Sequence, residues 1–181
     1  LRPVYLLSLW RDTATRRTLY SYAGNPVFVY TNGLRYLWPR FVALFEAWRI
    51  LRGLRTPADI LDIKFDGMRF GDVVYDNVLI LGYATIKRVD LKVFLVLYAF
   101  HVHRHIIKDI IERFRPVTSV LSHTIGLTGA CYSRYLLSRG TEVICRVGSH
   151  QIILKKYRTL SEAWFYPLKP EPIHFAIMHD R

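Results

Sequence analysis

The segment 117–147 restricts the fold of this chain most, because two apolar runs are joined through a helix-like stretch by very short connections. The first run is VTSVLSH, the second is TEVICRV, and the stretch between them, TGACYSRYLLSRG, is closed by Gly140. Two strands connected through a helix in this way lie parallel, with a right-handed crossover. The segment therefore predicts a βαβ unit.

The rest of the chain extends this pattern. Apolar runs and turn residues predict strands over 4–10, 26–31 and 150–157, and helices over 39–54, 57–63, 91–114 and 161–168. The stretch 65–90 has too many turn signals for one element, and we interpret it as a loop with short helical or extended pieces. We expect a single α/β domain over residues 1–181, with an open, mostly parallel Rossmann-like sheet flanked by helices.

The chain is strongly basic, with 26 Lys and Arg against 14 Asp and Glu, a net charge of +12. This balance favours anionic partners: the phosphates of a nucleotide or nucleic acid, or an anionic membrane surface. Nucleic acid is the less favoured of these, because no RRM, KH, zinc-finger or helix-turn-helix signature is present. No apolar run reaches the roughly 18 residues that span a bilayer, so any membrane association would be peripheral.

The cysteines and histidines do not form a metal signature. Cys131 and Cys145 fall on the predicted helix and strand of the βαβ unit, where we expect small buried thiols of a reduced, cytosolic protein. In HVHRH, His101 and His105 share one helix face and His103 points away, so at most two could meet one metal ion. We interpret this segment as basic, partly exposed helix surface, and expect no metal and no cofactor in this chain.

The first candidate site lies at the end of the strand 117–123. Ser122, His123 and Thr124 stand where parallel strands present ligands, before a loop with Gly126 and Gly129 that opens a helix. His123 could act as a general base on a hydroxyl, or it could merely cap the turn. The surrounding residues do not follow G-x-S-x-G, G-x-G-x-x-G or the Walker motif, so neither a hydrolase elbow nor a dinucleotide or NTPase site is predicted.

The second candidate is GDVVYDN, residues 71–77. Asp72, Tyr75 and Asp76 lie there in a glycine-flanked stretch that suits contacts to acceptor hydroxyls. Asp76 could equally cap a helix over 77–83.

Three blocks in this order resemble bacterial surface and capsular polysaccharide biosynthesis proteins. The blocks are G-x-x-x-G-D-x-x-Y-D at 67–76, T-I-x-x-x-D at 85–90 and V-x-S-H at 120–123, and the similarity covers about residues 56–158. An arginine often follows the Tyr-Asp pair in such sequences, whereas this chain has NVLILGY, which puts an anion-binding role of that stretch in doubt.

The resemblance implies a GT-B-like glycosyltransferase of two Rossmann-like domains facing a cleft. This chain would be the N-terminal, acceptor-side half, inactive alone, with the nucleotide-sugar donor on a C-terminal domain. His123 and Asp76 would be the catalytic residues, and Ser122, Thr124, Tyr75 and Asp72 would bind the acceptor.

The implied acceptor is a glycan or lipid-linked glycan, and the implied location is cytoplasmic, at the inner face of the membrane. The aromatic helix 39–54 would suit docking to such a membrane, although simple core packing is the favoured interpretation of that helix. The alternative to an enzyme is a basic nucleic-acid-binding or peripheral membrane scaffold module without catalysis.

Overall fold

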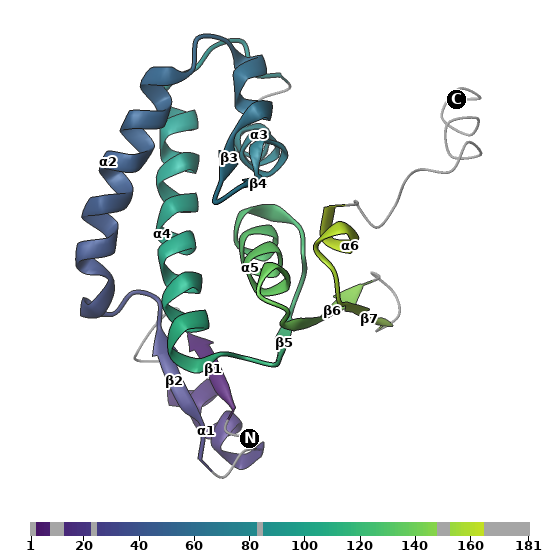
Figure 1. Cartoon of the computed structure of the whole chain (residues 1–181). Coiled ribbons are helices and arrows are strands. Elements are labelled where there is room, and N and C mark those ends of the chain that lie inside the picture. Colours follow the sequence, from purple (N-terminus) through teal and green to yellow (C-terminus); the bar gives the residue numbers. More distant parts are fainter. Residues whose placement is uncertain (1–2, 8–12, 23–24, 83–84, 148–152, 165–181) are drawn as a thin grey trace.

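The computed structural model describes residues 3–7, 13–22, 25–82, 85–147 and 153–164 (Figure 1). Its centre is a pair of long helices, α2 (Leu37–Gly53) and α4 (Leu91–Phe114), which lie side by side and run in opposite directions (Figure 1). On α2 the fully buried residues are the small Ala43 and Ala47, which allow the two backbones to approach closely. Asp90 caps α4 as predicted, by accepting a hydrogen bond from the Lys92 backbone N–H at 2.9 Å.

Two short parallel units flank this pair. At the N-terminal end, β1 (Val4–Leu7), α1 (Thr13–Tyr22) and β2 (Val27–Tyr30) form one unit, with β1 parallel to β2. After α4, β5 (Thr118–Leu121), α5 (Gly126–Ser138) and β6 (Glu142–Val147) form the second, and β7 (Ile153–Tyr157) adds an antiparallel strand. The βαβ unit predicted over 117–147 is therefore confirmed, although β5 ends before Ser122.

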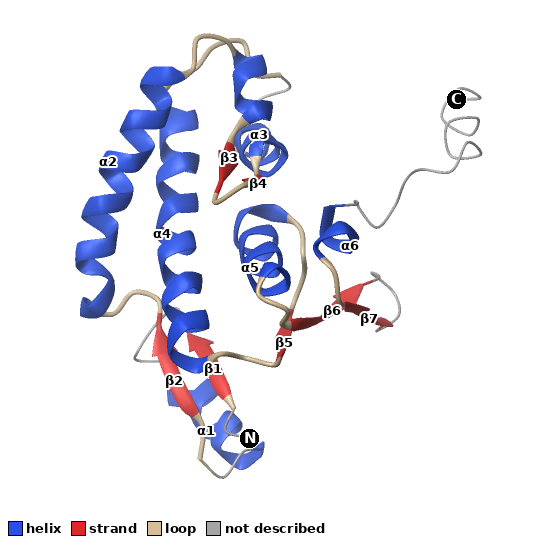
Figure 2. Ribbon diagram, viewed as in Figure 1, coloured by secondary structure: helices blue, strands red, loops and turns tan. Residues whose placement is uncertain are grey.

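The predicted open, mostly parallel Rossmann-like sheet is wrong. The described strands form three separate sheets of two, two and three strands, and helices predominate (Figure 2). The physical reason is that most of the buried apolar side chains lie on α3, α4 and α5 rather than on strands. Strand β5 leaves Val120 74% exposed, so one of its faces is uncovered, whereas a parallel sheet of this class is covered on both faces.

Between α2 and α4 the chain forms a 3₁₀ helix, where a helix over 57–63 was predicted, and then a hairpin and a further α-helix. The 3₁₀ helices η1 (Leu34–Tyr36) and η2 (Pro57–Asp62) flank α2, and a hairpin of β3 (Lys64–Phe65) and β4 (Met68–Arg69) leads into α3 (Gly71–Ile80). The stretch 65–90 thus contains short extended and helical pieces, as expected, although the bounds of α3 were not predicted. Helix α1 lies between the predicted strands 4–10 and 26–31, where no element was predicted.

The core lies where α3, α4, α5 and the hairpin meet. Phe65, Phe70 and Phe100 stack there, with 4.7 Å between the ring centroids of Phe100 and each of the other two. Cys131 and Cys145 are both buried, as expected. The helix α6 (Leu160–Trp164) follows β7, and parts of the segments predicted over 4–10, 150–157 and 161–168 lie outside the described residues.

The favoured interpretation of the aromatic helix, simple core packing, fails for its aromatic face, although Ala43 and Ala47 of the helix do belong to the core. On α2, Phe41, Leu44, Phe45 and Trp48 are exposed, and the alanines between them face α4. Among the described helices, none is long and apolar enough to cross a membrane.

Candidate functional site

The first candidate group occupies the turn between β5 and α5. Ser122 and His123 are exposed just beyond the end of the strand, and Thr124 is buried behind them. Helix α5 then begins at Gly126, and no side chain caps its first turn. The turn therefore presents a histidine and a hydroxyl to solvent at the carboxyl end of a parallel strand, the edge where such units bind ligands.

Close packing against Gly129 fixes the position of His123. A Cβ atom at position 129 would collide with Nδ1 of the His123 ring and with the His123 carbonyl oxygen. Only glycine leaves this space on the buried side of α5, so the ring lies over the first turn of the helix. The glycine that we assigned to a helix-opening loop is instead a packing residue inside α5.

The second candidate group lies on α3. Asp72, Tyr75 and Asp76 all fall inside this helix, so Asp76 does not cap a helix over 77–83. Asp72 and Asp76 are one turn apart and share a helix face, and Tyr75 packs half-buried against the core. Burial, with a contribution from the charge of Asp72, raises the pKa of Asp76. A carboxylate with a raised pKa is a better proton acceptor than an ordinary one.

Asp72 connects α3 to α5. The buried Arg134 donates two hydrogen bonds to its carboxylate, at 2.9 and 2.5 Å, and a third to the backbone carbonyl of Arg69 at 2.7 Å. Burial opposes ionisation of Asp72, but Arg134 outweighs it and lowers the pKa. The Asp72 carboxylate is thus held in a bidentate pair and orients α3.

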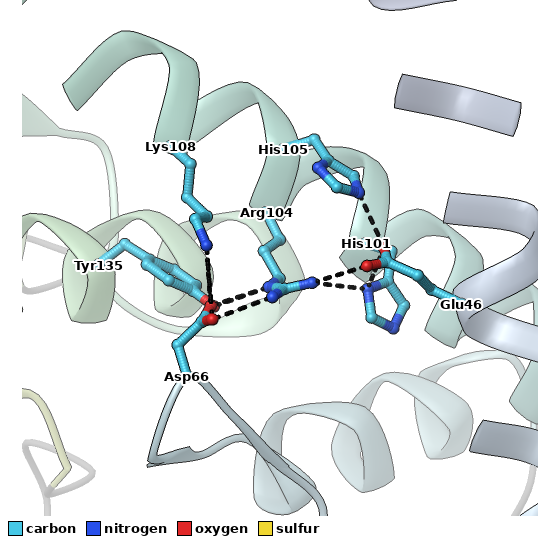
Figure 3. Close-up of polar contacts among 7 residues, drawn as sticks. All are labelled: Glu46, Asp66, His101, Arg104, His105, Lys108 and Tyr135. Carbon is cyan, nitrogen blue, oxygen red and sulfur yellow. Dashed lines mark hydrogen bonds and ion pairs between the residues drawn. The ribbon is translucent and has the colours of Figure 1, made fainter. Parts of the chain in front are cut away.

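A larger polar network lies next to this pair and was not predicted (Figure 3). The Asp66 backbone has a positive φ of 50° in the hairpin turn, and its carboxylate accepts hydrogen bonds from Arg104 at 3.0 Å to each oxygen and from the Tyr135 hydroxyl at 2.5 Å. Lys108 adds a weaker contact at 3.4 Å. The hydrogen bond from Arg104 is the main reason why the pKa of Asp66 lies well below its ordinary value.

On its other side, Arg104 reaches Glu46 of α2. The Glu46 carboxylate lies 3.2 Å from Arg104 Nη1, 3.0 Å from His101 Nδ1 and 2.8 Å from His105 Nε2 (Figure 3). Burial opposes ionisation of Glu46, but these neighbours outweigh it and lower the pKa. Burial lowers the pKa of His101 to about 4, so this histidine is neutral at pH 7.

We interpreted the HVHRH segment as basic, partly exposed helix surface. Its His101 is buried, and together with Arg104 and His105 it belongs to a polar network that connects several elements of the fold. The network joins α2, the hairpin, α4 and α5 through charges that are mutually satisfied. Two features of the sequence could have indicated it: the Asp-Gly pair at 66–67, a hairpin signal, and the i, i+4 histidines on α4. Within the described residues, no group of three or more His, Cys, Asp or Glu side chains could hold a metal ion.

Both candidate groups are attached to α5. Its residues Arg134 and Tyr135 hold the start of α3 and the hairpin, and its first turn carries the His123 ring. Five residues, or roughly 7.5 Å of helix axis, separate Gly129 from Arg134. The two groups are therefore held by the same helix.

Comparisons of the chain with protein-family models, with curated proteins and with solved structures find no match.

Proposed function

We propose that this chain is the acceptor-side domain of a glycosyltransferase in bacterial surface polysaccharide biosynthesis. The enzyme would transfer a sugar from a nucleotide-sugar to a glycan or lipid-linked glycan. The observation that supports this proposal is that two of the blocks that carry the sequence resemblance, 67–76 and 120–123, are attached to one helix. Asp72 is bonded to Arg134 of α5, and His123 packs on Gly129 of the same helix.

The reaction needs a base that accepts the proton of the acceptor hydroxyl while the anomeric carbon is attacked. Two residues suit this role by their chemistry: His123, exposed at the end of β5, and Asp76, whose pKa is raised. Ser122, Thr124 and Tyr75 would orient the acceptor, and Asp72 would position α3 through Arg134. Positive groups would stabilise the leaving phosphate, which suits a chain of net charge +12.

The donor nucleotide-sugar would bind to a further domain, so this chain would supply acceptor binding and the base. We place the protein in the cytoplasm, at the inner face of the membrane, where nucleotide-sugars and lipid-linked acceptors meet.

The test compares His123→Ala and Asp76→Asn in the complete protein, by transfer of radiolabelled sugar to a glycan acceptor. Loss of the catalytic base lowers kcat by about 10²–10⁴-fold. Thr118→Ala, an exposed change on β5 outside the candidate groups, is the control and leaves the rate unchanged. Each variant must keep the wild-type thermal unfolding midpoint. If both substitutions leave transfer at the wild-type rate, neither residue is the base and the proposal fails.

A further inference from the structure

The outer face of α2 carries an apolar arc. Six large side chains on it are exposed, and Trp38 and Phe41 are 74% and 68% accessible. With about 100° of rotation per residue, the six fall within an arc of about 120° that runs the length of the helix. The arc consists of Leu37, Trp38, Phe41, Leu44, Phe45 and Trp48. No described part of the chain covers it, and an exposed apolar patch of this kind marks an interaction surface.

Positive charge borders the arc, and negative charge is missing from it. Residues 34–55 contain five arginines and a single acid, Glu46. That acid points inward, to His101 and His105 of α4. On the outer side, the Arg52 guanidinium lies 4.7 Å from the ring centroid of Trp48. The face thus combines aromatic side chains with cations, the composition of helices that lie flat in a membrane interface.

The C-terminal end of the arc opens into a basic pocket. This pocket has a volume of about 660 Å³, and Trp48 and Arg52 belong to both the arc and the pocket. Its other cations are Arg55, Lys87 and Arg88, and no acidic residue lines it. Four cations thus line the pocket and no carboxylate does, a composition that suits the binding of a phosphate group.

We propose that the apolar arc and the basic pocket form one surface that docks the protein on an anionic phospholipid bilayer. The arc enters the interface, and the pocket binds the phosphate of a lipid headgroup. A bilayer fits better than a protein partner, because the surface joins a continuous aromatic face to clustered cations without acids. The inference rests on the proposed function for its setting, a lipid-linked acceptor, whereas the docking itself can be measured without any transfer reaction.

The test is co-sedimentation of the full chain with vesicles of phosphatidylethanolamine and phosphatidylglycerol, compared with vesicles of phosphatidylcholine. We expect binding to the anionic vesicles. The variant Trp38→Ser/Phe41→Ser/Phe45→Ser lowers the partition coefficient at least tenfold. The matched control Ile80→Ser/Leu154→Ser changes exposed apolar residues elsewhere and leaves it unchanged.

A second pair of variants tests the pocket. Changing Arg52, Arg55, Lys87 and Arg88 to Gln lowers binding by about 100-fold or more, since each cation near an anionic surface contributes roughly fivefold. The control changes four other exposed cations, so the net charge falls equally: Lys64, Arg69, Arg139 and Arg146 to Gln. If both charge variants lose binding equally, attraction is non-specific and the pocket has no role.

Two further outcomes would overturn the inference: absence of binding to anionic vesicles, or a self-associated chain whose dimer is broken by the arc variant. Failure of docking is distinguishable from failure of the proposed function. If the complete protein binds vesicles but does not transfer sugar, the docking surface is supported and the proposed glycosyltransferase function is refuted. If it transfers sugar but does not bind vesicles, the function is supported and the docking surface is refuted.

Discussion

A buried neutral histidine makes this fold sensitive to mild acid. His101 is 1% exposed, its Nδ1 faces Glu46, and its ring packs edge-on against Phe65 with 4.8 Å between centroids. In the described structure its Nε2 has no hydrogen-bond partner. Protonation would place a positive charge on a buried imidazole that packs against aromatic rings and lies beside Arg104, so burial lowers its pKa from 6.5 to about 4.

The magnitude follows from linkage. Between pH 6.5 and pH 4 the unfolded chain binds a proton at His101 that the folded chain does not, so stability falls as pH falls. One pKa unit corresponds to about 1.4 kcal/mol, so the loss between pH 7 and pH 5 is about 2 kcal/mol. Other charged or titratable groups act on His101, namely Glu46 and Arg49 of α2 and His105 and Arg104 of α4. The pKa of Glu46 is lowered, so the contribution of its ionised form to stability is lost only at pH values below the ordinary pKa of a glutamate.

The assay is urea unfolding at several pH values from 5 to 7.5, for the wild type and for His101→Asn. Asparagine keeps a donor near the position of Nδ1 but does not titrate. The variant loses the packing of the imidazole ring at every pH. The prediction is therefore tested by the pH dependence of the unfolding free energy and not by its absolute value. His123→Asn is the control, because it removes an exposed histidine that lies outside the Glu46 cluster. A His101→Asn variant with the full wild-type decline towards pH 5 would refute the reasoning.

Two further predictions concern α3. Gly71→Ala places a Cβ against backbone oxygens of η2 and lowers the unfolding free energy by about 1–3 kcal/mol in urea titrations. The control is Gly53→Ala, which has open space around its Cβ and is neutral or stabilising by up to about 1 kcal/mol. Equal effects of the two changes would contradict the close packing of Gly71. Asp72→Asn weakens the pair with the buried Arg134 and costs about 1–3 kcal/mol. It also removes the charge that helps to raise the pKa of Asp76, so in the complete protein the acidic limb of the transfer rate moves to lower pH if Asp76 is the base.

Local patterns were predictable from the sequence and long-range pairing was not. The unit 117–147 and the Asp90 cap of α4 depend on residues close together in the chain, and both are confirmed. The single sheet failed because strand pairing depends on distant segments, and short apolar runs do not specify their neighbours. Helix α3 was missed because it begins at Gly71 without a side-chain cap, at a position where close packing, not helix propensity, requires glycine.

The candidate site shows the same division. The sequence indicated which residue types gather around the end of β5 and the 67–76 block, but not that Asp72 is held by Arg134. Nor did it indicate that Glu46 of α2 meets three side chains of α4, because this depends on the register between two helices.

The orientation of α2 joins the polar network to the proposed docking surface. A helix with aromatic residues along one side could bury them in the core. Full burial of a large apolar side chain contributes about 1.5–3 kcal/mol, and each of the six residues in the arc gains only part of this free energy. Instead, the inward side carries Ala43, Ala47 and Glu46, and bulky rings there would force α2 away from α4 and separate Glu46 from its partners. The close approach of α2 to α4 and the contacts of Glu46 thus fix the rotation of α2 about its axis, and this rotation turns the aromatic rings outward. A partner that covers the arc would remove these exposed apolar side chains from water. A bilayer interface does this while the arginines beside the arc stay in contact with water and headgroups.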